Sequence, residues 1–364
     1  MKRNTNDFRV HVVEPSELGP EELRAWREWC GRDAALQGPY FHPEFMRAVA
    51  EVRNDVRVGV LEDTAGLAGF FPFQRTGFRT ARPVGGRLSD FHGVVARPGW
   101  RWSVCELIRR CGLAAWDFTH LPTTQPAFAR HCRVVEASPF LDLSRGFDSY
   151  VDERRKLGSR SISQTQRKAR KLAREVGPLR FERHVDDGRI LRTLMDWKSR
   201  QYRRSDISDV FSFPWAAALL KRLHATRHRD FGGQLSALSA GDELVALHFG
   251  IYSENVLHYW FPAYDPQFDR YSAGLVLLLE MARDSATRGF ARIDLGNGTE
   301  RYKTSLASGA IGVASGSVES DAMVHAVRRC WRHTRSWLKT SPVGAPARMS
   351  ARLVRPLREW LSFR

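Results

Sequence analysis

The sequence predicts an α/β protein made of two related halves. Helix-like and strand-like patterns alternate along the chain, which is typical of mixed α/β folds. A strand–turn–strand pattern occurs at 56–74, turning at 63–66, and returns at 234–253, turning at 240–243. We therefore expect an N-terminal half at 1–150, a second half at 151–320 and a tail at 321–364. Chance recurrence of a common hairpin pattern is the alternative.

Length and composition limit the protein class. The chain has 364 residues, enough for two domains, and 43% of them are hydrophobic, enough for a real core. No run approaches the roughly 18–20 apolar residues of a spanning helix, and the first ten residues lack the apolar segment of a signal peptide. Five scattered cysteines form no CxxC pair. We expect a soluble cytoplasmic protein with no metal site.

The net charge of +17 is concentrated in two short segments. Residues 151–177 carry 9 basic and 3 acidic side chains, and residues 325–364 carry 10 and 1. Residues 178–324 are neutral overall, with 18 of each sign. Such segments suit nucleic acid, an anionic membrane surface, or simply a solvated helix face and a basic tail.

The elements of the first half follow from local signals. Residues 20–31 open with proline and two glutamates, as helix N-termini do. Helices are also predicted at 43–53 and 103–113. The segment FLDL at 140–143 has the pattern of a strand that leads into the first basic segment.

The second half uses the same elements. Residues 157–177 place apolar side chains on one helical stripe amid arginine and lysine. Further helices are predicted at 188–203, 214–228 and 274–288. Strands are predicted at 256–263, 290–296 and 309–318.

The turn before the 274–288 helix has features of an anion site. It reads Arg270-Tyr271-Ser272-Ala273-Gly274. A helix N-terminus offers free backbone N–H groups and partial positive charge, which suit phosphate. Ser272 is expected to be the N-cap, and Gly274 would let a ligand approach the backbone. An ordinary capped helix is the alternative.

The order of motifs along the chain resembles a known family. Tyr271–Gly274 is followed by Leu275–Leu279, Ala286–Gly289, Ile293-Asp294-Leu295 and Gly296–Lys303, which reads GNGTERYK. The earlier segments FHPEFMRAVAE, GFFPFQR, GGRLSDFHGVV, RKARKLAREVGPLRFE and DWKSRQYRRSDISDVFSFPW fit the same order. Over residues 20–310 the chain resembles GNAT-superfamily acyltransferases of the CelD/BcsL type, which carry a BioF2-like acetyltransferase domain.

The resemblance implies acyl transfer from an acyl-CoA thioester on a tandem GNAT-like fold similar to that of Fem-type transferases. The turn formed by Arg270, Tyr271, Ser272, Ala273 and Gly274 would then take the place of the pyrophosphate loop. The stricter signature of that loop, Q/R-x-x-G-x-G/A, is not matched in spacing.

Acyl transfer needs a route for the proton of the nucleophile and a means of stabilising an oxyanion. His248 and Asp294 interrupt apolar strands, so either could act as the base or orient it. Glu300 is a third candidate, and Lys303 is expected near phosphate or substrate. The alternatives are a core histidine, an aspartate that holds the following turn, and a surface ion pair.

The acceptor side is predicted from one helix and one strand. Trp197, Lys198, Gln201 and Tyr202 lie at i, i+1, i+4 and i+5, so they share a broad helical face. Tyr259, in the aromatic cluster of the following strand, is grouped with them. Packing and solvation of this face is the alternative.

The tail at 325–364 combines tryptophan and leucine with arginine and lysine, which suits an interfacial helix on an anionic membrane. A packing or disordered tail is the alternative.

The leading hypothesis is an acyl-CoA-dependent N- or O-acyltransferase acting on a saccharide or a membrane lipid such as a sphingoid base. The alternatives are a Fem-like transferase that uses aminoacyl-tRNA and a non-catalytic protein that binds nucleic acid or an anionic surface.

Overall fold

A computed structural model of the chain describes residues 8–298 and 300–320, together with Val324, Ala326, Arg328 and Cys330. The described residues form two compact units. The first comprises residues 8–32, 49–135 and those from 314 onward, and the second comprises 33–48 and 136–313. The predicted amphipathic tail therefore lies almost entirely outside the described residues. No helix within the described part of the chain is long and apolar enough to cross a membrane.

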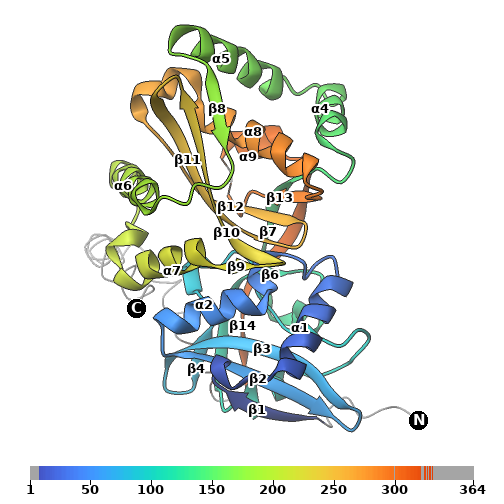
Figure 1. Ribbon diagram of the computed structural model, residues 1–364. Helices are drawn as coiled ribbons and strands as arrows, with labels where there is room; N and C mark the ends of the chain where they lie inside the picture. Colours follow the sequence, from blue (N-terminus) through green and yellow to red (C-terminus); the bar gives the residue numbers. More distant parts are fainter. Residues whose placement is uncertain are drawn as a thin grey trace, which may run out of the picture. The chain divides into compact units, whose positions relative to one another are not determined.

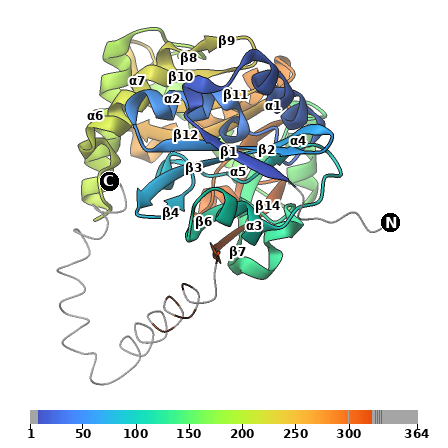
Figure 2. The same ribbon diagram turned by 90° about the horizontal axis from the view of Figure 1, so that it is seen from below.

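The first unit is a mixed sheet with helices against it (Figures 1 and 2). The hairpin predicted at 56–74 is confirmed, with Asp63 paired to Gly66 at its turn. Helix α1 packs on β3, where the Trp26 and Phe70 rings stack with centroids 4.6 Å apart. The strands run in the order β1 (Arg9–Val13), β2 (Val56–Asp63), β3 (Gly66–Gly77), β4 (Thr80–Arg82), β6 (Ala115–Pro122) and β14 (Gly309–Glu319), with β5 (Val95–Ala96) beside β3. The helices are α1 (Pro20–Arg32), α2 (Pro43–Val52, shared with the second unit) and α3 (Val104–Arg110).

The second unit repeats the plan around a longer hairpin. The hairpin predicted at 234–253 is confirmed, with Ala240 paired to Glu243. The strands of this unit run in the order β7 (Cys132–Asp142, whose first residues belong to the first unit), β13 (Arg292–Asp294), β12 (Val256–Tyr264), β11 (Glu243–Ser253), β10 (Phe231–Ala240) and β8 (Leu179–Glu182), with β9 (Arg227–His228) beside β10. The helices are α4 (Phe147–Lys156), α5 (Ser161–Glu175), α6 (Gly188–Arg204), α7 (Pro214–Ala225), α8 (Ala273–Thr287) and α9 (Arg301–Leu306).

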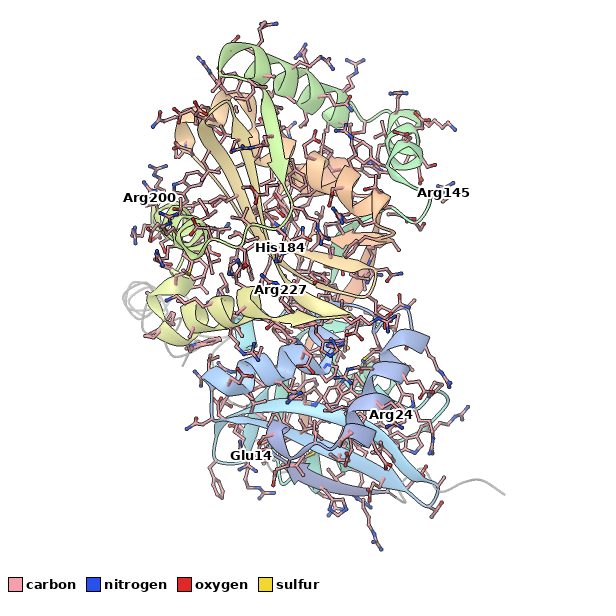
Figure 3. The ribbon with its side chains drawn as sticks, in the orientation of Figure 1. Glu14, Arg24, Arg145, His184, Arg200 and Arg227 are labelled. Atoms are coloured by element: carbon pink, nitrogen blue, oxygen red, sulfur yellow. The ribbon has the colours of Figure 1, made fainter. Side chains whose placement is uncertain are left out.

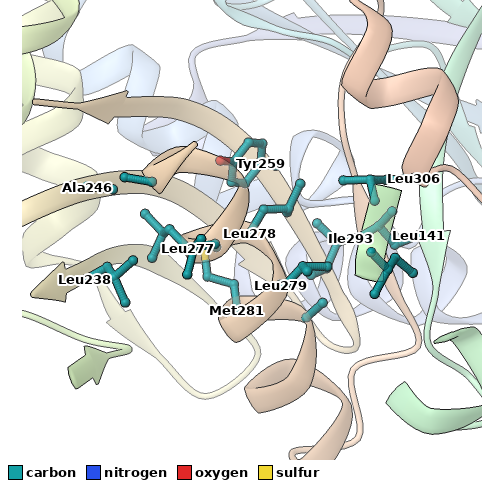
Figure 4. Packing of buried hydrophobic residues seen from close by; sticks show 14 of the residues in the cluster. Leu141, Leu238, Ala246, Tyr259, Leu277, Leu278, Leu279, Met281, Ile293 and Leu306 are labelled. Carbon is teal, nitrogen blue, oxygen red and sulfur yellow. The ribbon is translucent and has the colours of Figure 1, made fainter. Parts of the chain in front are cut away.

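Helices cover both faces of the β10–β11 hairpin and its neighbour β12. Figure 1 shows α6 and α7 on one side of these strands and α8 on the other. The α8 side holds the main core of the unit, where leucines of α8 pack against β-strand residues (Figure 4). Leu277 and Leu278 are completely buried, as is Ile293 on β13. The apolar run that marks this helix in the sequence is therefore its core-facing surface.

A β-bulge lies between β11 and β12, at the point where the pairing of β12 with β13 ends. On the β11 side, Phe249 pairs with Phe261 but Ile251 pairs with His258, so two residues of β12 face Gly250. On the other side, β12 pairs in parallel with β13 only from Val256 to His258. Beyond the bulge, no strand among the described residues pairs with that edge of β12. This opening leaves backbone groups in need of partners.

Helix α4 is tied to the end of α9 by one buried hydrogen bond. The Tyr150 hydroxyl donates to the Leu306 carbonyl at 2.8 Å, and Tyr150 is 2% exposed. Burial raises the pKa of the Tyr150 phenol, so it stays a donor. The bond fixes the end of the helix whose start carries Glu300 and Lys303.

We predict that Tyr150→Phe lowers the free energy of unfolding by about 1–3 kcal/mol, because the Leu306 carbonyl loses its donor inside the protein. Urea unfolding followed by circular dichroism measures the change. Tyr252→Phe is the matched control, since the Tyr252 hydroxyl makes no recorded hydrogen bond to the described residues. Equal effects of the two substitutions would contradict the assigned role of Tyr150.

Candidate active site

The predicted phosphate-binding turn begins helix α8. Ser272 stands at the N-cap position, but its backbone is left-handed, with φ 53° and ψ 49°, and its side chain makes no capping bond. The expected capping role of its hydroxyl is therefore wrong. The hydroxyl instead accepts a hydrogen bond from Lys168 Nζ of α5 at 2.7 Å. A left-handed non-glycine residue is strained, and such strain is common at functional sites.

The first backbone N–H groups of α8 remain available. The Ser272 carbonyl accepts from the N–H groups of Leu275 and Val276. For Ala273 and Gly274, no acceptor of the N–H is recorded in the described part of the chain. A Cβ added at Gly274 would lie 3.4 Å from one ring carbon of Tyr264, an ordinary contact. This N-terminus therefore presents N–H groups and a nearby lysine ammonium, a combination that suits an anion.

The basic helix α5 is anchored to this turn. The Tyr271 hydroxyl donates to Glu175 Oε2 at 2.9 Å, and Arg270 donates to the same hydroxyl. That hydrogen bond from Tyr271, helped by the nearby cations, lowers the pKa of the Glu175 carboxyl. The Arg270 guanidinium lies over the Tyr271 ring, 4.6 Å from its centroid. These contacts hold Lys168 beside Ser272.

His248 is a fully buried histidine on β11. Its ring stacks on that of Tyr259 with centroids 4.5 Å apart and planes 6° apart. Neither ring nitrogen has a hydrogen-bond partner among the described residues. Burial, with smaller contributions from His258 and Lys198, lowers the pKa of His248 well below its usual value. The imidazole is therefore neutral at physiological pH.

Tyr259 connects His248 to the phosphate-binding turn. Its hydroxyl donates to the Gly274 carbonyl at 3.4 Å while its ring stacks on His248. Burial raises the pKa of this phenol well above its usual value, so it stays protonated. Two predicted groups of residues, one on the strands and one on the turn, are thus brought together.

Lys198 is buried on α6 and reaches the open edge of β12. Its Nζ donates to the Pro262 carbonyl and to Gln201 Oε1, both at 3.1 Å, and it lies 5.2 Å from the centroid of the Tyr202 ring. Only 9% of the residue is exposed. Burial lowers the pKa of this amine to about 8. Three of the predicted acceptor residues therefore form one contact group.

Asp294 is paired with its neighbour on β13. Its Oδ1 lies 2.7 Å from Arg292 Nε, and the Asp294 side chain is 2% exposed. The ion pair compensates the charge of a carboxylate at this buried position. Asp294 stands opposite His258 in the parallel register, where β12 and β13 separate.

Glu300 and Lys303 form an ion pair at the start of α9. Lys303 Nζ lies 3.2 Å from Glu300 Oε2 and also donates to the Asn297 carbonyl at 2.9 Å. The lysine side chain is 7% exposed and that of the glutamate 56%. The pair is thus half-buried and locks the loop that follows β13, while Glu300 keeps a solvent-facing carboxylate.

A pocket of about 540 Å³ lies between α6 and the loop after β12. Trp197 and Gln201, both predicted on the acceptor side, line it, whereas Lys198 and Tyr202 are not among its lining residues. Arg200, which projects from α6 (Figure 3), lies in its wall. The other lining residues are Arg204, Ser205, Tyr264, Asp265, Pro266, Gln267 and Asp269. Tyr264 joins the pocket to Gly274.

Several residues of this region were not predicted from the sequence. Lys168 lies on the basic helix predicted at 157–177, and nothing in its spacing pairs it with a serine 104 positions later. Tyr264 and Arg204 belong to the pocket only because a loop folds over α6. Arg292 could have been found, because an arginine two residues from a buried aspartate on one strand lies on the same face.

A second group of ionisable residues lies elsewhere in the same unit. His42 Nε2 is 3.5 Å from Asp230 Oδ1, and His228 bonds the same oxygen through Nδ1. The bond from His42, followed by that from His228, lowers the pKa of Asp230. His42 Nδ1 accepts from the Glu44 N–H, so the neutral ring carries its proton on Nε2, facing the carboxylate. The potential ligand atoms of these three residues all lie within 4.8 Å of one another, close enough to hold a metal ion.

One part of the chain matches a known protein family. Residues 160–304 match the family described as acetyltransferase (GNAT) domain. No significant match was found among curated protein sequences. The matched range contains α5, the α8 turn, the pocket and all the site residues predicted from the sequence.

Solved structures with the same fold share little sequence. FemX is 10% identical over 85% of this chain and 97% of its own, with a TM-score of 0.55. A tandem GNAT protein from the clavulanic acid biosynthesis pathway is 12% identical over 86% and 99%, with a TM-score of 0.50. The C-terminal domain of a protein described as a lysylphosphatidylglycerol synthetase, from Agrobacterium fabrum, is 12% identical over 85% and 94%, with a TM-score of 0.52. The fold is thus the tandem GNAT-like fold, and residues 160–304 match a GNAT acetyltransferase domain, which supports an acyltransferase.

Proposed function

We propose that the protein transfers an acyl group from an acyl-CoA thioester to an amine or hydroxyl group. The observation that carries the donor assignment is the start of α8. There, two first-turn N–H groups without recorded acceptors stand beside Lys168, and Gly274 leaves the approach to the backbone open. The pyrophosphate of CoA has the charge and size for this position. Arg270 and Tyr271 hold the turn in place.

The open edge of β12 supports a place for the rest of the donor. The pantetheine arm of CoA carries amide groups, which pair with an unoccupied strand edge as a neighbouring strand would. The edge runs from the bulge toward Tyr264, close to the α8 turn. The thioester would then lie near the bulge, beside the stacked rings of His248 and Tyr259.

The predicted catalytic residues receive different roles in this proposal. His248 and Asp294 are buried, so they shape the electrostatics and position the strands near the thioester. Glu300 is the solvent-facing carboxylate of the three and could pass a proton to water. Lys303 holds the loop that carries Glu300 and is near enough to influence Lys198.

We predict that Gly274→Ala weakens acyl-CoA binding about tenfold or more, because the added methyl occupies the approach to the first-turn N–H groups. Thermal shift titrations with acetyl-CoA through palmitoyl-CoA measure the affinity and the preferred chain length together. Gly188→Ala is the matched control: it also lies in the first turn of a helix, with nothing within 4 Å of its added Cβ. Unchanged affinity in Gly274→Ala would remove the α8 turn from the donor site.

The pocket beside α6 is proposed for the acceptor. Trp197 and Tyr264 offer aromatic surfaces, and the carboxylate, amide and arginine groups around them offer hydrogen bonds. This mixture suits a sugar carrying an amine or hydroxyl group. A membrane lipid with an amine headgroup is the second candidate, supported by the exposed Ile207 on the segment after α6 and by the basic, tryptophan-bearing tail sequence.

We predict that Trp197→Ala raises the KM for the acceptor about tenfold and leaves acyl-CoA binding unchanged, because it removes one wall of the pocket. Release of CoA thiol with glucosamine or with sphinganine as acceptor measures the effect and decides between the two classes. Phe78→Ala, at a side chain 93% exposed in the other unit, is the control. A rise in KM for acyl-CoA instead would place the donor in this pocket.

The tail at 325–364 is proposed to hold the protein on an anionic membrane. We predict co-sedimentation with phosphatidylglycerol vesicles that falls as salt rises, because each basic residue near such a surface contributes about 1 kcal/mol. Deleting residues 331–364 should abolish it, while Arg328, paired with Asp117, is kept. Phosphatidylcholine vesicles are the control. Retained binding after the deletion would assign the interaction to another surface.

A further inference from the structure

The hydrogen bonds of Lys198 distinguish its two protonation states. An ammonium has three N–H donors, whereas a neutral amine has two and a lone pair. The described residues offer Lys198 Nζ two acceptors, the Pro262 carbonyl and Gln201 Oε1. The neutral amine therefore satisfies both of its N–H groups here and keeps its lone pair free, while the ammonium has a surplus donor and a buried charge.

The charges around Lys198 do not cancel this preference. The groups that influence it from the neighbouring elements are Glu300, which favours the ammonium, and Lys303, which opposes it and is itself paired with Glu300. His248 on β11 is neutral, and the centroid of the Tyr202 ring on the same helix lies 5.2 Å from Lys198 Nζ. No carboxylate within the described residues forms an ion pair with Lys198, in contrast to Lys303.

The position of Lys198 also fits a role in proton transfer. It holds the carbonyl of Pro262 on the part of β12 that no described strand covers on its other edge. Its partner Gln201 lines the pocket beside α6. Lys198 thus lies between the proposed acceptor pocket and the proposed course of the thioester.

We propose that Lys198 is the general base of the acyl transfer. The inference rests on the proposed function and names the group that handles the proton. The acceptor nitrogen or oxygen bonds to the thioester carbonyl carbon while its proton passes to the Lys198 lone pair. The C–S bond then breaks, and the CoA thiolate takes that proton back from the ammonium. The net change is one proton moved from acceptor to CoA sulfur, with Lys198 returned to its neutral state.

Three variants test the assignment. Lys198→Met keeps the length and removes the base, Lys198→Arg keeps a cation that does not release its proton, and Lys221→Met removes an exposed lysine of α7. Release of CoA thiol is followed with whichever of glucosamine or sphinganine the wild type uses. Both Lys198 variants should lose about 10²–10⁴-fold in kcat, and Lys221→Met should lose nothing. Thermal shift by acyl-CoA should be unchanged in all three.

A second measurement reports the protonation state directly. In protein labelled with ¹⁵N-lysine, the Nζ signal that is missing from Lys198→Met should titrate near pH 8. The rate of the wild type should rise with pH through the same range and then level, because the base is the deprotonated form.

The outcomes of these experiments distinguish a failure of the inference from a failure of the proposed function. If the wild type neither binds nor consumes acyl-CoA, the proposed function fails and the inference fails with it. If the wild type is active and Lys198→Met keeps its rate, the base is another group and the acyltransferase assignment stands. Substantial activity in Lys198→Arg would assign the lysine to charge stabilisation and overturn its role as a base.

Discussion

The early end of the pairing between β12 and β13 is the constraint on which the active region depends. The bulge opposite Gly250 turns β12 away after His258, and a Cβ at Gly250 would lie only 2.3 Å from the His258 carbonyl oxygen. A strand edge left inside a protein must find hydrogen-bond partners. Lys198 supplies one of them at Pro262, and the remainder of the edge is the natural place for an amide-bearing substrate.

Among the buried charged groups described in this region, Asp294 and Lys303 have ion-pair partners and Lys198 has none. Asp294 has Arg292, and Lys303 has Glu300 and two loop carbonyls, so each charge is compensated where it lies. Lys198 receives neutral acceptors and, among the described residues, no counter-ion. Burial without a counter-ion lowers the pKa of a lysine toward physiological pH, so both of its protonation states are populated. A group that accepts and then releases a proton needs such a pKa.

The structure shows where part of the excess positive charge of the chain lies. The first basic segment forms the end of α4 and all of α5, and α5 is fixed to the α8 turn through Tyr271 and Glu175, so that Lys168 contacts Ser272. One of its positive charges therefore lies beside the proposed phosphate position. The strained backbone of Ser272 is maintained by these contacts from a helix more than ninety residues earlier.

The sequence by itself determined the α/β class, both hairpins and the helices from α5 to α8, because these depend on local periodicity and turn residues. The order of its motifs also pointed to the turn at 270–274 and to the helical face around Trp197. Only the tertiary structure decided that Lys168 rather than a helix N–H takes the Ser272 hydroxyl, that Asp294 pairs with Arg292, and that Lys198 meets Pro262. Such pairings depend on where a bulge interrupts a sheet and on which helix lies against it. Those are long-range packing outcomes, and no local pattern of residues encodes them.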